Sequence, residues 1–351
     1  MNTNKSSPVS RKSIQLLEEL SAAIEAGMHR QLDSSSGPLY DMVKYQLGWI
    51  SPKGELPTMH QSKRNLGSFC LFTSLLLGGS ISQSLPVAIG IELAAEFNQI
   101  HHAIQQGDPK TDSGDTLWWL WGPAQAINAG DGMHILSRLS LNRLTENGIE
   151  DKLHLEALRT LDQSILTHCE GQYLYLNFQE RIDITVKQYM AMAEKKEGSF
   201  LSAALQLASL TATSTQHRLG LLETIGVQLG IAKQISSDLS FLSSAFDQDN
   251  SSVLISEIAN KNKLLPVVYA IETGTLNQKR KLGSIYFKKF LEKDDMTEIQ
   301  TVLSDTHAIE YSTKVRSDLL QQSLEELIKI EYNKDMGKLI PSVLEIILSK
   351  K

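Results

Sequence analysis

Helical periodicity runs through almost the whole chain and constrains its fold more than any other feature. Leu17, Leu20 and Ile24 recur every three or four residues, and similar spacing returns in 153–166 and 319–330. Apolar residues at these intervals line one face of an α-helix. Alternating strand-like segments and hairpin turn signals are missing from the sequence. The chain is therefore predicted to be all-α.

Short turn segments separate the predicted helices. The segments 34–38, 51–57 and 107–114 are rich in Gly, Pro and Ser, as loops are. None is long or biased enough to be an interdomain linker, and no internal repeat stands out. We expect a single domain over residues 14–351, preceded by a flexible N-terminus over residues 1–13, because that start is polar and terminal.

The charge distribution argues against one class of partner. The 351 residues carry a net charge of −6, and Lys and Arg are scattered along the chain. A nucleic-acid surface needs clustered basic residues to replace the counterions of the phosphates. We therefore expect no nucleic-acid partner.

The cysteines and the apolar segments indicate a cytoplasmic protein. Cys70 and Cys169 are the only cysteines, and both stand in apolar surroundings, so we expect reduced, buried thiols. The start lacks the apolar segment of a signal peptide. The most apolar segment, 69–77, is too short for a transmembrane helix, which needs about 20 residues.

Several motifs between Tyr45 and Tyr269 carry a resemblance to a known family. The most specific is the run from Trp121 to Asp131, Trp-Gly-Pro-Ala-Gln-Ala-Ile-Asn-Ala-Gly-Asp. The others are Ser-Lys-Arg-Asn-Leu-Gly at 62–67, Gly-Gln-Tyr-Leu-Tyr at 171–175, the segments 189–199 and 230–241, and Lys-Leu-Leu-Pro at 263–266. Together they resemble the polyprenyl synthetase family, the trans-isoprenyl diphosphate synthases. The resemblance implies an isoprenoid-synthase-type helical bundle around a central cavity.

The resemblance also implies residues that bind a diphosphate. The positions where this chain keeps a matching polar residue are Lys63, Arg64, Lys196, Gln234 and Lys263. Leu66 stands where the family has a second arginine. Lysine cannot replace the planar, bidentate donor lost there.

The family's two Asp-rich metal motifs are not matched. The positions that differ are His102, Ala103 and Gln106 in the first motif, and Ser237 and Phe241 in the second. Tyr175 and Glu197 likewise stand where the family has an acid and a threonine. Asp108 and Asp238 are the carboxylates that remain, and they are candidate ligands for one Mg²⁺, which prefers oxygen ligands.

The pair His101–His102 does not suit a replacement metal site. His101 and His102 point about 100° apart on a helix, so they cannot both bind one ion without distortion. We expect His134 and His168 to be core histidines. Glu92, Glu96 and Glu170 lie near the cavity by resemblance, or are helix-surface and helix-pairing acids.

Three functional hypotheses follow. The first is a degenerate isoprenyl diphosphate synthase homologue, a non-catalytic or modulatory subunit that forms a homodimer or a heterodimer with an active prenyltransferase. The second is a divergent prenyltransferase or class I terpene synthase that acts on an allylic prenyl diphosphate with a noncanonical metal site; Mg²⁺ would then be its cofactor. The third is a metal-free carrier of an isoprenoid ligand.

Overall fold

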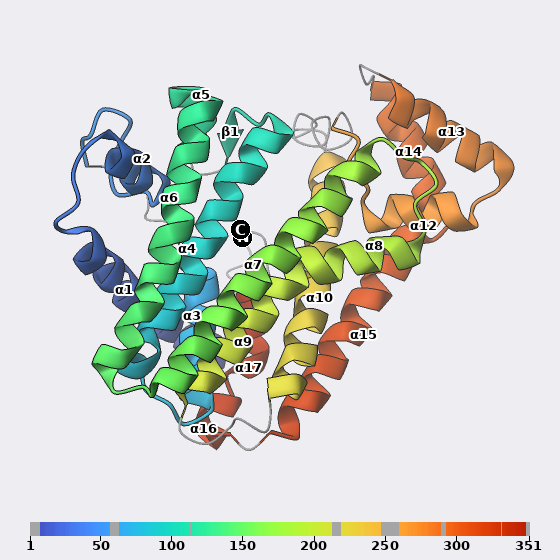
Figure 1. Ribbon diagram of the computed structural model, residues 1–351. Helices are drawn as coiled ribbons and strands as arrows, with labels where there is room; N and C mark the ends of the chain where they lie inside the picture. The colour runs from blue at the N-terminus through green and yellow to red at the C-terminus, as the bar shows by residue number, and fades with distance from the viewer. Residues whose placement is uncertain are drawn as a thin grey trace. The chain divides into compact units, whose positions relative to one another are not determined.

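The protein is built almost entirely from helices, as predicted (Figure 1). The computed structural model describes residues 8–56, 63–111, 114–212, 219–246, 260–288, 293–330 and 332–348. One local feature was not predicted: β1 (Lys110–Thr111) and β2 (Gly114–Asp115) pair as an antiparallel ladder within the predicted loop 107–114. The prediction of an all-α class is confirmed, with this short ladder as an addition.

The contacts divide the chain into two compact units, which are described separately. Unit 1 comprises residues 1–163, 203–220 and 331–347, and unit 2 comprises 164–202, 221–330 and 348–351. The prediction of a single domain over residues 14–351 stays a prediction.

Unit 1 is centred on the long helix α4. The elements that lie in it, wholly or for most of their length, are α1 (Pro8–Leu32), α2 (Pro38–Gln46), α3 (Asn65–Leu76), α4 (Ile81–Gln106), β1, β2, α5 (Leu117–Trp121), α6 (Pro123–Leu141), the 3₁₀ helix η1 (Asn142–Asn147), α9 (Ser199–Thr211), α16 (Lys334–Gly337) and α17 (Ile340–Leu348). Helix α4 packs along α6 and α3, and α1 packs on α3 and α4. Gly67 allows the close approach of α3 to α4, because a Cβ there would lie 2.7 Å from the Ala88 carbonyl oxygen.

Unit 2 is built around the second half of α7 (Asp151–Gln179) and α10 (Leu219–Phe246). The other elements are α8 (Val186–Ala193), the π-helical turn η2 (Glu194–Gly198), α12 (Leu265–Thr273), α13 (Leu276–Phe287), α14 (Lys293–Asp305) and α15 (Ala308–Ile328). One apolar core joins α7, α8 and α10 through Tyr189, Met192 and Ile235, which are fully buried. A Cβ at Gly230 would clash with the backbone of Gly198, so glycine at this position allows α10 to pack closely on η2.

Two expectations need correction. Helix α1 begins at Pro8, and Ser13 is buried and hydrogen-bonded to Ser342 of α17, so residues 8–13 are part of a packed helix. Residues 1–7 of the predicted flexible start lie outside the described residues. Cys70 is buried as predicted, but Cys169 is exposed, because it lies on the outward face of α7 between Leu166 and Tyr173.

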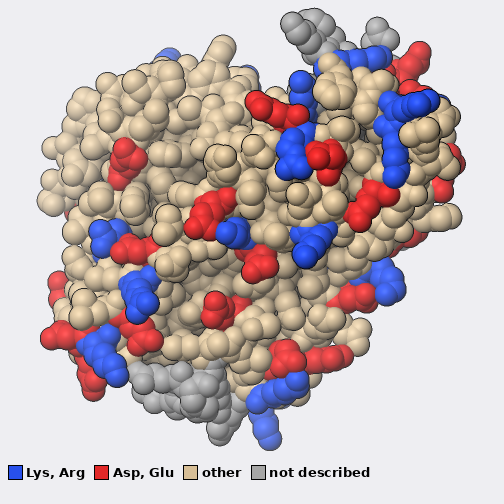
Figure 2. Space-filling model, turned by 45° about the vertical axis from the view of Figure 1, so that its right-hand side comes forward, with Lys and Arg blue, Asp and Glu red and all other residues tan. Residues whose placement is uncertain are grey.

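Charges of both signs are mixed on one face of the molecule (Figure 2). On the face shown in Figure 2, Lys and Arg lie next to Asp and Glu, and no extended basic area is visible there. Among the described helices, none is both long and apolar enough to cross a membrane.

Candidate functional site

Arg64 is the centre of a buried ionic network in unit 1. Its guanidinium is 0% exposed and donates to the Glu25 carboxylate at 2.7 Å, to Glu96 at 3.4 Å and to the Leu47 carbonyl at 2.6 Å. Lys63, the preceding residue, is exposed. Of these two predicted diphosphate contacts, Lys63 is thus accessible to solvent, whereas Arg64 is committed to acceptors within the protein.

The Arg64 network contains more acid than base. Glu92 accepts a hydrogen bond from the Gly67 backbone N–H at 2.7 Å, and Glu96 accepts one from the Gln46 side chain at 2.9 Å. Burial raises the pKa of Glu92 to about 7, although Arg64 and the Gly67 N–H act in the opposite direction. Burial likewise raises the pKa of Glu96. These two acids connect α4 to α2 and α3, as the helix-pairing interpretation expects.

The end of α4 carries the positions that the resemblance assigns to the first metal motif. His102 and Gln106 are half-buried and Ala103 is buried. Gly107 ends the helix in the left-handed conformation, with φ 70°. Asp108 follows in the connection to β1, and burial raises the pKa of its half-buried carboxyl group. Asp108 is therefore a single carboxylate beyond the helix end.

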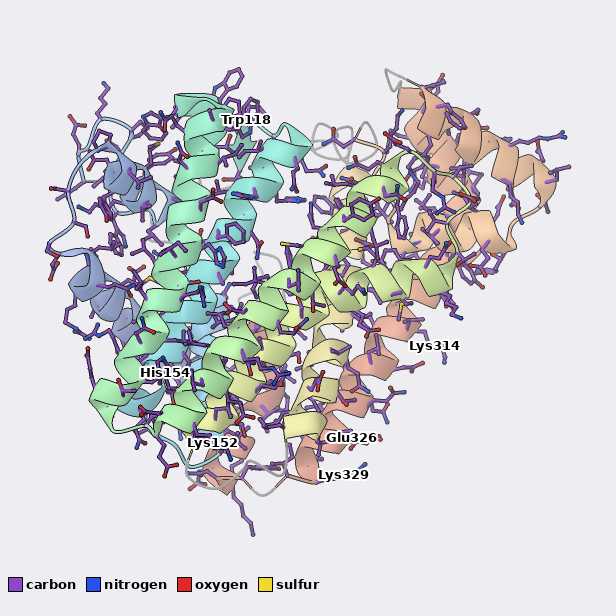
Figure 3. The ribbon with its side chains drawn as sticks, in the orientation of Figure 1. Trp118, Lys152, His154, Lys314, Glu326 and Lys329 are labelled. Atoms are coloured by element: carbon purple, nitrogen blue, oxygen red, sulfur yellow. The ribbon has the colours of Figure 1, made fainter. Side chains whose placement is uncertain are left out.

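Backbone contacts hold Asp108 in place. Its carbonyl oxygen accepts hydrogen bonds from the Thr116 hydroxyl at 2.9 Å and from the Trp118 indole N–H at 2.7 Å. Trp118 lies on the short helix α5 (Figure 3). The Trp118 indole therefore has a structural contact here, because it ties α5 to the chain beyond α4.

His101 and His134 of unit 1 both contact the Phe97 ring. The His101 ring meets Phe97 edge-on, with 4.6 Å between centroids, and its Nε2 is 3.7 Å from an Asp131 carboxylate oxygen. His134 stacks on Phe97 and is half-buried, so it lies at the edge of the core. Burial lowers the pKa of His134.

Asp238, the candidate metal ligand of unit 2, is surrounded by hydrogen-bond donors. Asp238 is only 1% exposed. Its carboxylate accepts hydrogen bonds from the Tyr189 hydroxyl at 2.5 Å, the Gln234 side chain at 2.9 Å and the Leu265 N–H at 2.8 Å. Ser237 is half-buried beside it, and Phe241 packs on the core between α10 and α12–α14. This carboxylate therefore links α8, α10 and the start of α12.

Lys196 is held by residues at two of the positions where the chain differs from the family. Its ammonium lies 3.2 Å from the Glu197 carboxylate and 4.9 Å from the centre of the Tyr175 ring. It also donates to Gln234 at 3.1 Å. The main chain of the same turn is fixed by His168, whose Nδ1 is 2.6 Å from the Lys196 carbonyl oxygen.

His168 is a buried histidine, as predicted. Burial, with the nearby Lys196 charge, lowers its pKa to about 4. The ring is therefore neutral at pH 7, so its Nδ1 can carry the proton donated to the Lys196 carbonyl.

Glu197 bridges two lysines. One oxygen is 3.2 Å from Lys196 and the other is 3.2 Å from Lys233 of α10. Burial alone would raise the pKa of Glu197, but Lys233 and Lys196 hold it well below its usual range. The carboxylate is therefore ionised at neutral pH.

Lys263 is buried within unit 2. Its ammonium donates to the carbonyl groups of Lys261 at 2.6 Å and Gln179 at 3.4 Å, and it lies 4.6 Å from the centre of the Tyr286 ring. Burial lowers its pKa to about 7. Lys263 is only 3% exposed, so its ammonium binds these main-chain carbonyl groups and does not face an open anion site.

A magnesium cluster of the family type needs several oxygen ligands gathered at one place. Mg²⁺ takes oxygen ligands in near-octahedral geometry. Within the described ranges, no group of three or more His, Cys, Asp or Glu is placed to hold a metal. The Asp238 carboxylate already accepts three hydrogen bonds, from Tyr189, Gln234 and the Leu265 N–H. The assignment of Asp108 and Asp238 as metal ligands stays a prediction.

Sequence reasoning missed Glu25 and Lys233. Glu25 is 39 residues from Arg64, and no motif connects them. The one signal for Lys233 in the sequence is its place beside Gln234 in the segment 230–241. Glu170, considered as a cavity acid, instead pairs with Lys195 at 2.5 Å, and both side chains are at least 40% exposed.

The chain matches the sequence model of polyprenyl synthetases over residues 60–303, and it belongs to this family. It is 28% identical to geranylgeranyl diphosphate synthase of Mycobacterium tuberculosis, over 64% of this chain and 63% of that relative. It is also 28% identical to short chain isoprenyl diphosphate synthase of Methanothermobacter thermautotrophicus, over 81% of this chain and 85% of the relative.

Solved structures show the same fold. Polyprenyl synthetase from Streptomyces coelicolor superposes with a TM-score of 0.85 at 20% identity, covering 95% of this chain and 99% of the other. Geranylgeranyl pyrophosphate synthetase from Pyrococcus horikoshii superposes with a TM-score of 0.82 at 21% identity, covering 97% and 100%. The predicted isoprenoid-synthase-type fold is confirmed.

Proposed function

We propose that this chain is a degenerate isoprenyl diphosphate synthase homologue that works as a non-catalytic or modulatory subunit beside an active prenyltransferase. The relatives bear the names of geranylgeranyl and short chain isoprenyl diphosphate synthases, which places the task in isoprenoid metabolism. The active partner would supply the metal chemistry, and this chain would supply a matching helical surface.

The observation that carries the proposal is that the polar groups around Lys196 are paired with one another. The lysine contacts Glu197, Gln234 and the Tyr175 ring, and Gln234 in turn donates to Asp238. A synthase must present open carboxylates to metal ions and open cations to a diphosphate. In unit 2 the corresponding charges are bound to one another.

An exposed apolar face on α6 supports the partner role. Ile127, Ile135 and Leu139 are 43–50% exposed, and their spacing of eight and four residues puts them on one side of the helix. The helix also borders a groove of about 560 Å³ with a largely apolar lining, to which α2 contributes Leu39 and Met42. Apolar groups gathered on a surface mark protein–protein contacts.

The test is assembly with an active isoprenyl diphosphate synthase from the same organism. The two chains should co-purify, and the mixture should give a different product chain-length distribution from the active chain alone. Ile135→Asp should abolish both effects without unfolding the protein, because Ile135 is half exposed. The matched control is Leu276→Asp, at an exposed apolar residue on α13. Unchanged products and no co-purification would contradict the proposal.

A further inference from the structure

The bridge between Lys196, Glu197 and Lys233 has the geometry of an occupied anion site. Each carboxylate oxygen of Glu197 faces a different ammonium, both at 3.2 Å. The Lys196 and Glu197 side chains are 12% and 23% exposed, whereas that of Lys233 is 40% exposed. A site with one partly open side and two ammonium groups can hold one oxyanion. Here that oxyanion is part of the chain.

Tertiary contacts fix the backbone of the turn that carries Lys196 and Glu197. Glu197 belongs to the π-helical turn η2, a feature that often occurs at functional sites. His168 fixes the turn through the Lys196 carbonyl. Gly171 lets α7 lie directly against the backbone of Lys195 and Lys196. A change in the Glu197 side chain should therefore leave the backbone at Lys196 in place.

The bridge needs no external anion, because groups of the protein itself bind its charges. Gln234 accepts a further hydrogen bond from the Lys196 ammonium, and its amide donates to Asp238. An external phosphate would have to displace a tethered carboxylate, whose effective concentration at the lysines is far higher than that of a free anion. The native chain should therefore bind free phosphates weakly.

We propose that Glu197 is an internal anion that closes an oxyanion site formed by Lys196 and Lys233, and that removing its charge opens this site to phosphate or diphosphate groups. This inference rests on the proposed function, because it explains how the site at Lys196 is kept from binding a diphosphate. It assigns Lys233 to the site and gives Glu197 an autoinhibitory role.

Titration calorimetry with inorganic pyrophosphate, without metal ions and at low ionic strength, tests the proposal. Glu197→Gln keeps the side-chain shape and removes the charge, and it should bind pyrophosphate at least tenfold more tightly than the native chain. Adding Lys233→Gln should remove most of that gain. The matched control is Glu170→Gln, which deletes the same charge from the exposed pair with Lys195 and should not gain affinity.

Three results would overturn the inference: equally tight binding by the native chain, no gain in Glu197→Gln, or the same gain in Glu170→Gln. If Glu197→Gln does not fold, as judged by circular dichroism, Glu197→Thr provides the second variant with the same expected gain. The assay contains no prenyl substrate. Its failure would leave the proposed function standing, whereas turnover by the isolated chain would refute the proposed function whatever the pyrophosphate result.

Discussion

Two buried charge networks, one in each unit, are balanced in opposite ways. In unit 1 a single cation, Arg64, lies among three acids, and burial raises the pKa of Glu92 to about 7. In unit 2 two cations share Glu197, whose pKa is held below its usual range by Lys233 and Lys196 against the effect of burial. Burial thus favours a bound proton on Glu92, whereas the two lysines favour an ionised Glu197. This contrast predicts different responses to mutation and pH.

Removing Arg64 should have the largest effect. Arg64→Met leaves Glu25 and Glu96 without their cation in a site that excludes water. Breaking a buried ion pair on one side costs about 3–5 kcal/mol, so urea unfolding at pH 7 should show a loss of this size. Arg138→Met is the control: its pair with Asp162 is 43% exposed on both sides, and its loss should cost less than about 1 kcal/mol. Similar losses in both variants would contradict a special role for the Arg64 network.

Glu92→Gln should change the pH dependence of stability. The pKa of Glu92 rises from 4.5 to about 7 on folding, so the folded state holds the proton more tightly than the unfolded state. The stabilisation is complete below pH 4.5 and is lost as pH rises through 7. The variant should lack this loss and gain, relative to the native chain, up to about 3 kcal/mol between pH 4.5 and 8.

Unfolding at a series of pH values measures this difference. The exposed acid Glu19, replaced by Gln, serves as the control and should show no such trend. A constant difference between Glu92→Gln and the native chain over this pH range would mean that Glu92 is ionised in the folded protein.

Tyr189→Phe tests whether Asp238 depends on its donors. The change removes the hydroxyl that donates to the carboxylate at 2.5 Å and keeps the buried ring. A hydrogen bond to a charged group contributes about 1.5–3 kcal/mol, and thermal or urea unfolding should show a loss in that range. Tyr173→Phe, at a ring 69% exposed, should be neutral. A neutral Tyr189→Phe would show that the Asp238 carboxylate is not stabilised by this contact.

Exposed ion pairs should contribute least to the free energy of unfolding. Lys329 pairs with Glu326 at 2.6 Å near the end of α15, where both residues lie at the surface (Figure 3). The lysine side chain is 62% exposed, so solvent and salt screen the attraction. Lys329→Ala should change the free energy of unfolding by less than about 0.5 kcal/mol. A larger loss would mean that exposed pairs also hold the fold together, which would weaken the contrast between the two buried networks.

The helical class and the family could be predicted from the sequence, whereas the state of the site residues could not. Periodicity gives each helix a buried face, and the run from Trp121 to Asp131 is specific to the family. The pairing of Arg64 with Glu25 joins α1 to the start of α3 across 39 residues, a distance over which spacing carries no information. The π-helical turn at Glu194–Gly198 depends on tertiary contacts of His168 and Gly171, so local patterns do not predict it.

Arg64 and Lys263 illustrate the same limit of motif comparison. Both stand at positions that bind a diphosphate by resemblance, and both are buried with acceptors inside the protein. A motif specifies residue types, but burial and neighbours decide whether a charge is open to a ligand. The acids around Arg64 come from α1 and α4; the sequence pointed to Glu92 and Glu96 of α4 but not to Glu25 of α1.

The most direct test of the proposed non-catalytic role is to measure turnover by the isolated chain. Purified protein would be incubated with Mg²⁺, isopentenyl diphosphate and geranyl, farnesyl or geranylgeranyl diphosphate, followed by product analysis. A non-catalytic subunit should give no prenyl product and no cyclised hydrocarbon when it is alone. A product that disappears in Asp108→Asn or Asp238→Asn would contradict it and would identify the chain as a divergent synthase whose metal ligands include those carboxylates.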